Sequence, residues 1–597
     1  MSAVVLFSPS EGRTDFISAE EASNIVSSSH HLRPSLNQSH FSVGSKHDRP
    51  LDPTNATRLT AFYSSSTRPL DCCASGRRGL ALVTPGTMPA LETEVLLPRR
   101  PSQHGVSNVE EAPRKKHIGV FSATFIIFNR LIGTGIFATP AAILGFTGST
   151  GMSLLLWVVG SCYALAGIQV YIVWGTAFPR NGGEKNYLEY LCPHPQRLVI
   201  CMYAANVALS GMCPWAAGNS LVFGEYIMKA LLDAQPSQAV LQTTAFSCIT
   251  FAFLLHGTAY RLGLRVQNAL GVFKLLTILI VVATGLSALR NGIPTEAGMP
   301  QDRWRGRENF KNMWKGTSRS LVSLCTGLYS VIWSFSGFSN ANYALSEVRN
   351  PARTLRIAGP LAVVVVASLY ILANIAYFAG ASKSEILSSG RLVVSLLMNN
   401  IWGEQVERWV DFGVALSSLG NVLAVSFSQG RVNQALGKEG ALPFSVIWAS
   451  DKPFNAPLGG LSLHWFMCVI VILFVPSGDA YNFVVNVITY PLSVINVTIS
   501  CGLLYLYFTS TSRPTNPLRD PDSHQWQNLS RYTLFSAVVF GLCSLFLIAV
   551  PLMKPPLGAE PYQSLPYWTH AVGGWCMFGL GAIWWAVKVR YERTLVE

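Results

Sequence analysis

Two runs of small and polar residues interrupt apolar stretches of the chain and offer backbone groups for binding. The first run contains Gly133 to Gly135, and the second contains Ser336 and Gly337. Glycine inside a helix is destabilising, so both runs predict a local unwinding. An unwound helix exposes N–H groups at the start of one half-helix and carbonyl groups at the end of another.

These groups suit the two charged ends of an amino acid. The positive end of a half-helix dipole favours a carboxylate, which we assign to Gly133, Thr134 and Gly135. The ammonium group needs acceptors, which we assign to the carbonyls of Phe335, Ser336 and Gly337. The predicted substrate-binding set is Ile132, Gly133, Thr134, Gly135, Ile136, Trp333, Phe335, Ser336, Gly337 and Phe338, with Trp333 as an aromatic gate. The alternative is that the glycines only allow close helix packing.

Lys274 is a charged side chain inside the apolar stretch 264–289. A lysine near the bilayer centre costs about 2.5–3.5 kcal/mol on insertion scales, so it indicates a functional position. The alternative is a lysine that extends to the interface near Arg265. Near the end of the sixth apolar stretch, Glu347 and Arg349 are predicted to close a cytoplasmic gate by ion pairing, and Glu225 is a further acid within the third stretch.

The composition is that of a membrane protein. Hydrophobic residues make up 50% of the chain and charged residues only 13%, whereas soluble proteins carry about 25% charged residues. The formal net charge is +13, but Lys and Arg gather in short connections rather than on one face, which argues against nucleic-acid binding. The 12 cysteines show no zinc-type spacing, so no metal site is predicted.

The apolar stretches predict an all-α polytopic membrane protein with about twelve transmembrane helices. They lie near 118–146, 150–178, 198–231, 240–259, 264–289, 320–345, 355–380, 407–437, 459–476, 480–508, 532–552 and 567–588. Residues 1–113 are predicted to be a disordered cytoplasmic tail, 114–590 the membrane domain and 591–597 a short cytoplasmic tail. The bias of Lys and Arg near helix ends places both termini in the cytoplasm, although the connection 290–319 is basic and falls outside.

The interrupted stretches are the first and the sixth, and each opens a block of five. Interruptions at corresponding positions of two halves indicate a transporter with inverted repeats and a site near the bilayer midplane.

The residues also carry a family resemblance. The run Gly133-Thr134-Gly135-Ile136-Phe137 resembles the first-helix signature of the amino acid, polyamine and organocation (APC) transporter superfamily. The stretches Ile118 to Leu144, Phe178 to Glu184 and Asn342 to Pro351 resemble the fungal high-affinity methionine permeases, and the resemblance covers about 115–590. It implies a LeuT-like 5+5 inverted repeat and proton-coupled uptake of methionine at the plasma membrane, with the proton gradient as driving force and no cofactor. It also implies that Lys274 bridges helices and carries or senses the coupled proton.

Other functions are alternatives to a symporter. An enzyme is not expected, because Gly337 to Ala341 falls short of the GxSxG motif and no HExxH motif occurs. Exchangers that pair with a glycoprotein subunit resemble one another in a cysteine after the third span; here 233–238 has none, so no heavy-chain subunit is expected. A nutrient receptor that retains the carrier fold stays open, as does an exchanger of broader neutral specificity.

We expect ubiquitin-ligase machinery to mark the protein for removal at Lys46 in the tail and at Lys115 and Lys116 directly after it. Replacement of these three lysines by arginine is expected to lengthen the lifetime of the protein at the cell surface, because arginine keeps the charge but cannot accept ubiquitin. Cycloheximide-chase immunoblotting measures this lifetime. An unchanged rate of loss of the protein would contradict a role of these three lysines in its removal.

Overall fold

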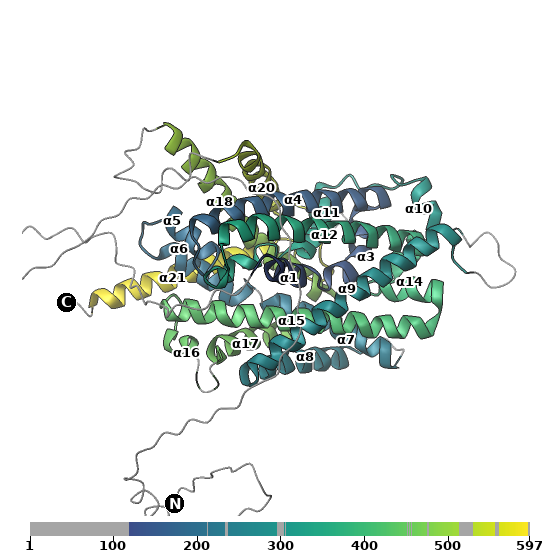
Figure 1. Cartoon of the computed structure of the whole chain (residues 1–597), viewed down its shortest axis with the longest axis horizontal. Coiled ribbons are helices and arrows are strands. Elements are labelled where there is room, and N and C mark those ends of the chain that lie inside the picture. The colour runs from purple at the N-terminus through teal and green to yellow at the C-terminus, as the bar shows by residue number, and fades with distance from the viewer. Residues whose placement is uncertain are drawn as a thin grey trace, which may run out of the picture. The chain divides into compact units, whose positions relative to one another are not determined.

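The protein is helical throughout the part that the computed structural model describes. The structure describes residues 119–594 except 212, 233–236, 295–303, 305, 451, 453, 455, 475–476, 513–528 and 556–559, and no strand occurs among them. The predicted tail, residues 1–113, lies outside this part, as do Lys46, Lys115 and Lys116. Figure 1 shows the helices of the membrane domain packed into one bundle.

All twelve predicted apolar stretches are helical, which confirms the predicted fold class. The first six are α1 (Val120–Leu131) with α2 (Gly135–Ala138) and α3 (Pro140–Thr147), α4 (Thr150–Ala177), α6 (Leu198–Asn206) with the π-helical turn η1 (Val207–Gly211) and α7 (Cys213–Leu232), α8 (Gln238–Thr258), α9 (Tyr260–Asn291), and α11 (Leu321–Phe335) with the 3₁₀ helix η3 (Asn340–Glu347). The other six are α12 (Pro351–Gly380), α15 (Glu404–Lys438), α17 (Leu458–Phe474), α18 (Ser477–Ser512), α20 (Arg531–Ala549) and α21 (Thr569–Thr594).

Nine helices among the described residues are long and apolar enough to cross a membrane. The third, sixth and ninth stretches instead contain shorter apolar helices, Leu198–Leu209, Leu321–Phe335 and Leu458–Phe474. The sixth is short because it ends at the second interruption, which the sequence predicted.

The connections contain short helices that the sequence analysis did not predict. They are α5 (Glu184–Leu191), α10 (Glu308–Lys311), α13 (Lys383–Ser388), α14 (Val393–Trp402), α16 (Ser445–Ala449) and η4 (Val550–Leu552). α14 is apolar but has only 10 residues, which span about 15 Å at 1.5 Å per residue and cannot cross a bilayer.

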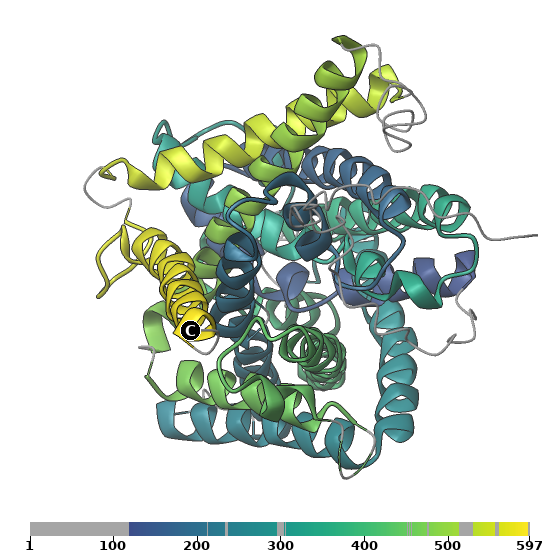
Figure 2. The same ribbon diagram turned by 90° about the vertical axis from the view of Figure 1, so that its left-hand side faces the viewer.

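The long helices pack along one another in two groups. α12 packs along α4, and α15 packs along α7 and α9. Helices at the rim present large apolar side chains outward, for example Phe535 on α20 at 66% exposure and Ile583 on α21 at 62%. Figure 2 shows α21, in yellow, at this periphery. Such exposure is costly in water and expected where lipid covers the surface.

The approach of α9 to α12 depends on a glycine. A Cβ added at Gly285 would lie 2.0 Å from the Cβ and 2.2 Å from the Cα of Ala376, whereas a Cβ added at Gly579 on α21 meets nothing within 4 Å.

Gly285→Ala is therefore expected to destabilise the fold by roughly 1–3 kcal/mol, since the backbone of α12 must move to accept the methyl group. Gly579→Ala is the matched control and is expected to be neutral or to stabilise by about 0.5–1 kcal/mol, because alanine favours a helix over glycine. Thermal unfolding of the two purified variants in detergent measures both effects. Equal midpoints would show that the two helices can separate at no cost.

Candidate functional site

The first interruption lies between α1 and α2. Ile132 ends α1 in an extended conformation (φ −73°, ψ 98°), and the helix resumes at Gly135. A Cβ on Gly133 would lie 2.1 Å from Nδ2 of Asn421 on α15, and one on Gly135 would lie 2.3 Å from Oγ of Ser334 on α11. The glycines therefore allow close packing as well as unwinding, so the two interpretations of the sequence both apply.

Lys274 replaces backbone hydrogen bonds that the interruption removes. Its side chain is completely buried. Nζ donates to the carbonyl of Asn129 at 3.0 Å and to that of Ile132 at 2.8 Å. This placement at the centre of the bundle excludes the alternative in which the lysine extends to the interface. It puts a positive charge between α9 and the end of α1.

Two tyrosines of α12 satisfy further carbonyls of the first interruption. The hydroxyl of Tyr370 lies 2.7 Å from the carbonyl of Leu131 and 3.1 Å from that of Ser334, beside the second interruption. The hydroxyl of Tyr377 donates to the carbonyl of Ile136 at 3.2 Å. Since an unsatisfied carbonyl in hydrocarbon costs several kcal/mol, α12 is part of what makes the interruption tolerable.

The N–H side of the first interruption faces an amide side chain. Oδ1 of Asn219 on α7 accepts from the backbone N–H of Thr134 at 3.4 Å and from its hydroxyl at 2.9 Å. Thr134 is only 1% exposed. The N–H group assigned to the carboxylate is thus covered by Asn219, and a ligand must displace that side chain to reach it.

The second interruption follows α11. Ser336 is extended (φ −68°, ψ 131°) after the last helical residue, Phe335. Gly337 has φ 115°, a backbone conformation that residues with a Cβ rarely adopt. A Cβ there would lie 2.5 Å from Cγ of Arg130. The two interruptions therefore meet at Arg130.

The predicted aromatic residues pack on other rings. Trp333 stacks on Trp215, with ring centroids 4.6 Å apart. Phe335 lies edge-on to Trp157 at 6.1 Å, and Phe338 lies edge-on to Tyr171 at 5.6 Å. These contacts hold the second interruption in place, and the gating role of Trp333 stays a prediction.

A cavity opens beside the second interruption. Its lining comes from α1, α5, α6, η1, α7, α15, α18 and the segment after α11, and consists of Arg130, Glu184, Tyr203, Asn206, Val207, Trp215, Ser336, Gly337, Ser339, Asn340, Tyr343, Gln429, Val432, Ile488, Leu492 and Ile495. Of the predicted substrate-binding set, Ser336 and Gly337 line this cavity. Gly133 to Gly135 and Trp333 lie outside its lining.

Glu184 is a buried carboxylate on the cavity wall, in the connection between α4 and α6. It accepts hydrogen bonds from the hydroxyls of Tyr171 at 2.8 Å, Tyr343 at 2.9 Å and Tyr203 at 3.2 Å. Burial raises the pKa of the Glu184 carboxyl above its usual value, and hydrogen bonds from its own backbone and these hydroxyls oppose the rise. The pKa of Glu184 therefore lies above that of a solvated glutamate, and three hydroxyl groups hold the carboxylate in place.

Sequence reasoning missed Arg130 and Glu184 as site residues. The signal that identified Lys274, a charge inside an apolar stretch, applies equally to Arg130, which is 2% exposed on α1. Glu184 gave no such signal, because it lies in a polar connection and is buried only by the tertiary structure.

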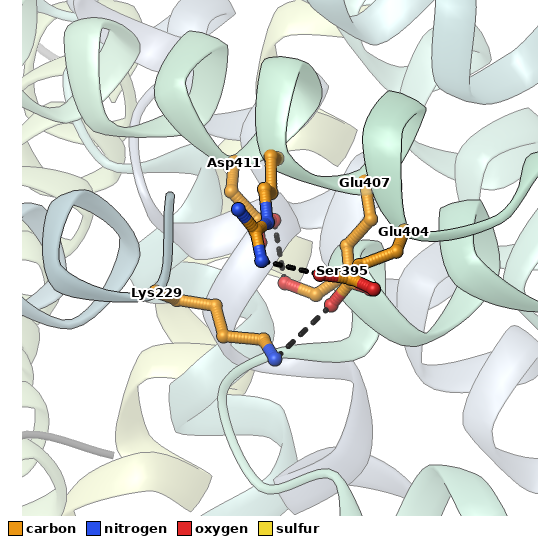
Figure 3. Close-up of polar contacts among 6 residues, drawn as sticks. Lys229, Ser395, Glu404, Glu407 and Asp411 are labelled. Atoms are coloured by element: carbon orange, nitrogen blue, oxygen red, sulfur yellow. Dashed lines mark hydrogen bonds and ion pairs between the residues drawn. The ribbon is translucent and has the colours of Figure 1, made fainter. Parts of the chain in front are cut away.

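Ion pairs gather at the opposite end of α7 and α15, as Figure 3 shows in part. Lys229 lies 3.5 Å from Glu407, and the hydroxyl of Ser395 donates to Asp411 at 2.5 Å. Nearby, Glu225 pairs with Arg391. The side chain of Glu347 lies outside those the structure describes, so its gate with Arg349 stays a prediction.

Interrupted first and sixth helices, with buried charges at the interruptions, define a multi-pass helical membrane protein of the secondary-transporter class. The chain belongs to the amino acid permease family, whose model matches residues 118–578. It is therefore an amino acid transporter.

The similar proteins are permeases and transporters. The chain is 41% identical over 474 residues, 79% of each chain, to the high-affinity methionine permease of Saccharomyces cerevisiae. It is 31% identical to the low-affinity methionine permease of the same yeast, over 76% of this chain and 78% of that one. It is 28% identical to the b(0,+)-type amino acid transporter 1 of Mus musculus, over 74% and 84% respectively.

Replacing Lys274 by methionine is expected to destabilise the fold, because the carbonyls of Asn129 and Ile132 then lose their donor at roughly 1–3 kcal/mol for each unsatisfied group. Leu276→Met is the matched control, since Leu276 lies on the same helix and is 53% exposed. The thermal unfolding midpoint of the purified protein measures the difference. A Lys274→Met midpoint equal to that of the control would mean that water or another side chain satisfies these carbonyls.

Proposed function

We propose that this protein imports L-methionine across the plasma membrane by proton symport. The observation that carries the coupling is the ammonium of Lys274 on the carbonyls of Asn129 and Ile132. The choice of methionine is supported by the similarity to the two yeast methionine permeases. No bond is made or broken in the reaction.

The proposed coupling follows from the hydrogen-bonding capacity of Lys274. A protonated amine has three donors, and a neutral amine has two and a lone pair. Complete burial disfavours the charged form, so the amine can pass its proton to a water molecule at the edge of the site. Loss of the proton weakens the hold of α9 on the end of α1, which frees the interrupted helices to change their packing. Substrate and proton then leave on the same side.

The proposed orientation places both termini and the connection that carries Glu184 in the cytoplasm. It rests on the excess of Lys and Arg at that end of the apolar stretches. The ion pairs of Lys229 with Glu407 and of Glu225 with Arg391 then lie toward the outside. They would have to separate or move when the outer end of the bundle opens.

An exchanger of broader neutral specificity is the second candidate. The chain is also similar to the mouse b(0,+)-type amino acid transporter 1, so a carrier for amino acids other than methionine stays a candidate. An apolar pocket separates side chains that differ by one methylene by only about 1–3 kcal/mol, so selectivity for methionine has to be measured. A receptor without transport is the third candidate.

The test is uptake of radiolabelled methionine into cells that lack their own methionine carriers. We expect saturable uptake that rises as the external pH falls, stops with a protonophore and is poorly inhibited by leucine. Lys274→Ala is expected to abolish the dependence on pH, because no titratable amine is left at the first interruption. Leu276→Ala, on the lipid-facing side of the same helix, is the control for surface expression and should keep that dependence.

The alternatives give different results in the same cells. Uptake only in exchange for internal amino acid would support the exchanger. Surface expression without uptake would support the receptor. Uptake that is independent of pH and protonophore would contradict symport while leaving amino acid transport in place.

A further inference from the structure

Arg130 is a buried cation without an anionic partner among the residues that the structure describes. It lies in the last turn of α1 with 2% of its surface exposed. The guanidinium lies over the ring of Trp215 at 3.8 Å, and Nη1 lies 3.4 Å from Oδ1 of Asn421. Its Nε has no hydrogen-bond partner. A buried charge left in this state is costly, so it indicates a ligand.

Two hydrogen-bond acceptors on the same cavity wall are also unsatisfied. Oε1 of Gln429 and Oδ1 of Asn340 are buried and have no partner in the described part of the chain. The amide nitrogen of Gln429 donates to the carbonyl of Val207 at 3.0 Å and to Oδ1 of Asn433 at 2.7 Å. These two bonds orient the amide and leave its oxygen as the open group.

Glu184 lines the cavity but does not pair with Arg130. Its carboxylate accepts from three tyrosine hydroxyls. No ion pair joins it to Arg130 within the described residues, so the guanidinium keeps its capacity for another anion.

We propose that this cavity is a second binding site for the transported amino acid, separate from Gly133 to Gly135. Arg130 holds the carboxylate of the ligand, and Asn340 and Gln429 accept hydrogen bonds from its ammonium group. The inference rests on the proposed function, in that the ligand is taken to be the transported amino acid.

The chemistry of the cavity matches a zwitterion with an apolar side chain. A guanidinium is a planar fork that binds a carboxylate with two parallel hydrogen bonds. Amide oxygens accept from an ammonium group. One part of the wall is aliphatic and contains Val207, Val432, Ile488, Leu492 and Ile495. An anionic or strongly polar side chain would meet no donor on that part of the wall.

The position of the cavity assigns the site to one side of the membrane. Glu184 and Tyr203 on its wall belong to the connection after α4 and to α6, which the proposed orientation places toward the cytoplasm. The site is therefore a station that the amino acid occupies on its way to the cytosol, after it leaves Gly133 to Gly135.

The test compares half-saturation for L-methionine at the two faces of sealed membrane vesicles, right-side-out and inside-out, that contain the full-length protein. Arg130→Lys keeps the charge but loses the two-bond geometry. We expect it to raise the half-saturation concentration at the cytoplasmic face about tenfold, equivalent to the loss of one charge-assisted hydrogen bond. The half-saturation concentration for L-methionine at the outer face should change by less than about twofold.

Two controls separate the binding role from a structural one. Arg431→Lys is the matched control, because the Arg431 guanidinium also lies over an aromatic ring, Phe427 at 5.2 Å, but Arg431 does not line the cavity. This variant should leave the half-saturation concentration for L-methionine unchanged at both faces. Gln429→Leu provides a second route if Arg130→Lys fails to fold. It should weaken cytoplasmic-face binding of L-methionine but not of 4-methylthiobutanoate, which has the carboxylate and no ammonium group.

The outcomes separate this inference from the proposed function. If Arg130→Lys changes the half-saturation concentration equally at both faces, or at neither face, while the wild type transports normally, the second site is wrong. The proposed transport function would not be affected by that result. An Arg130-dependent cytoplasmic site for another neutral amino acid would support the second site and overturn methionine as the substrate. Wild-type vesicles that carry no amino acid would overturn both.

Discussion

The hydrogen bonds from Lys274 to the end of α1 are the interaction on which the rest of the site depends. Lipid offers no donors, so a membrane helix can be interrupted only where other groups satisfy its freed carbonyls. Lys274 supplies donors to two of them, and Tyr370 and Tyr377 supply others. Since Tyr370 also lies within 3.1 Å of the carbonyl of Ser334, α12 links the first interruption to the second. Movement at one interruption therefore affects the other.

The same requirement explains how buried charges are tolerated in the bundle. Lys274 is held by carbonyls, Arg130 lies over Trp215 and beside Asn421, and Glu184 is surrounded by tyrosine hydroxyls. Each charge has polar contacts, but at the cavity the Arg130 guanidinium and the amide oxygens of Asn340 and Gln429 keep unused hydrogen-bonding capacity. A ligand with complementary charges can satisfy hydrogen-bonding groups that have no partner next to a cavity.

The glycines of the two interruptions have more than one physical role. Gly337 adopts a φ of 115° that disfavours other residues, and it also lets Arg130 approach the backbone. Gly133 and Gly135 allow Asn421 and Ser334 to come close to the first interruption. Unwinding and close packing are thus not alternatives in this protein, because an unwound segment needs side chains nearby to satisfy it.

The sequence by itself determined the place of the apolar helices, the two interruptions and the presence of a charge, Lys274, inside an apolar stretch. These follow from local properties: hydrophobic length, glycine content and a charge within an apolar stretch. Only the tertiary structure decided which groups satisfy each interruption, since Asn219, Tyr370 and Asn421 come from helices far along the chain. It also decided that Glu184, in a polar connection, is buried at the cavity. Contacts of this kind depend on how helices pack against one another, and no short stretch of sequence encodes that packing.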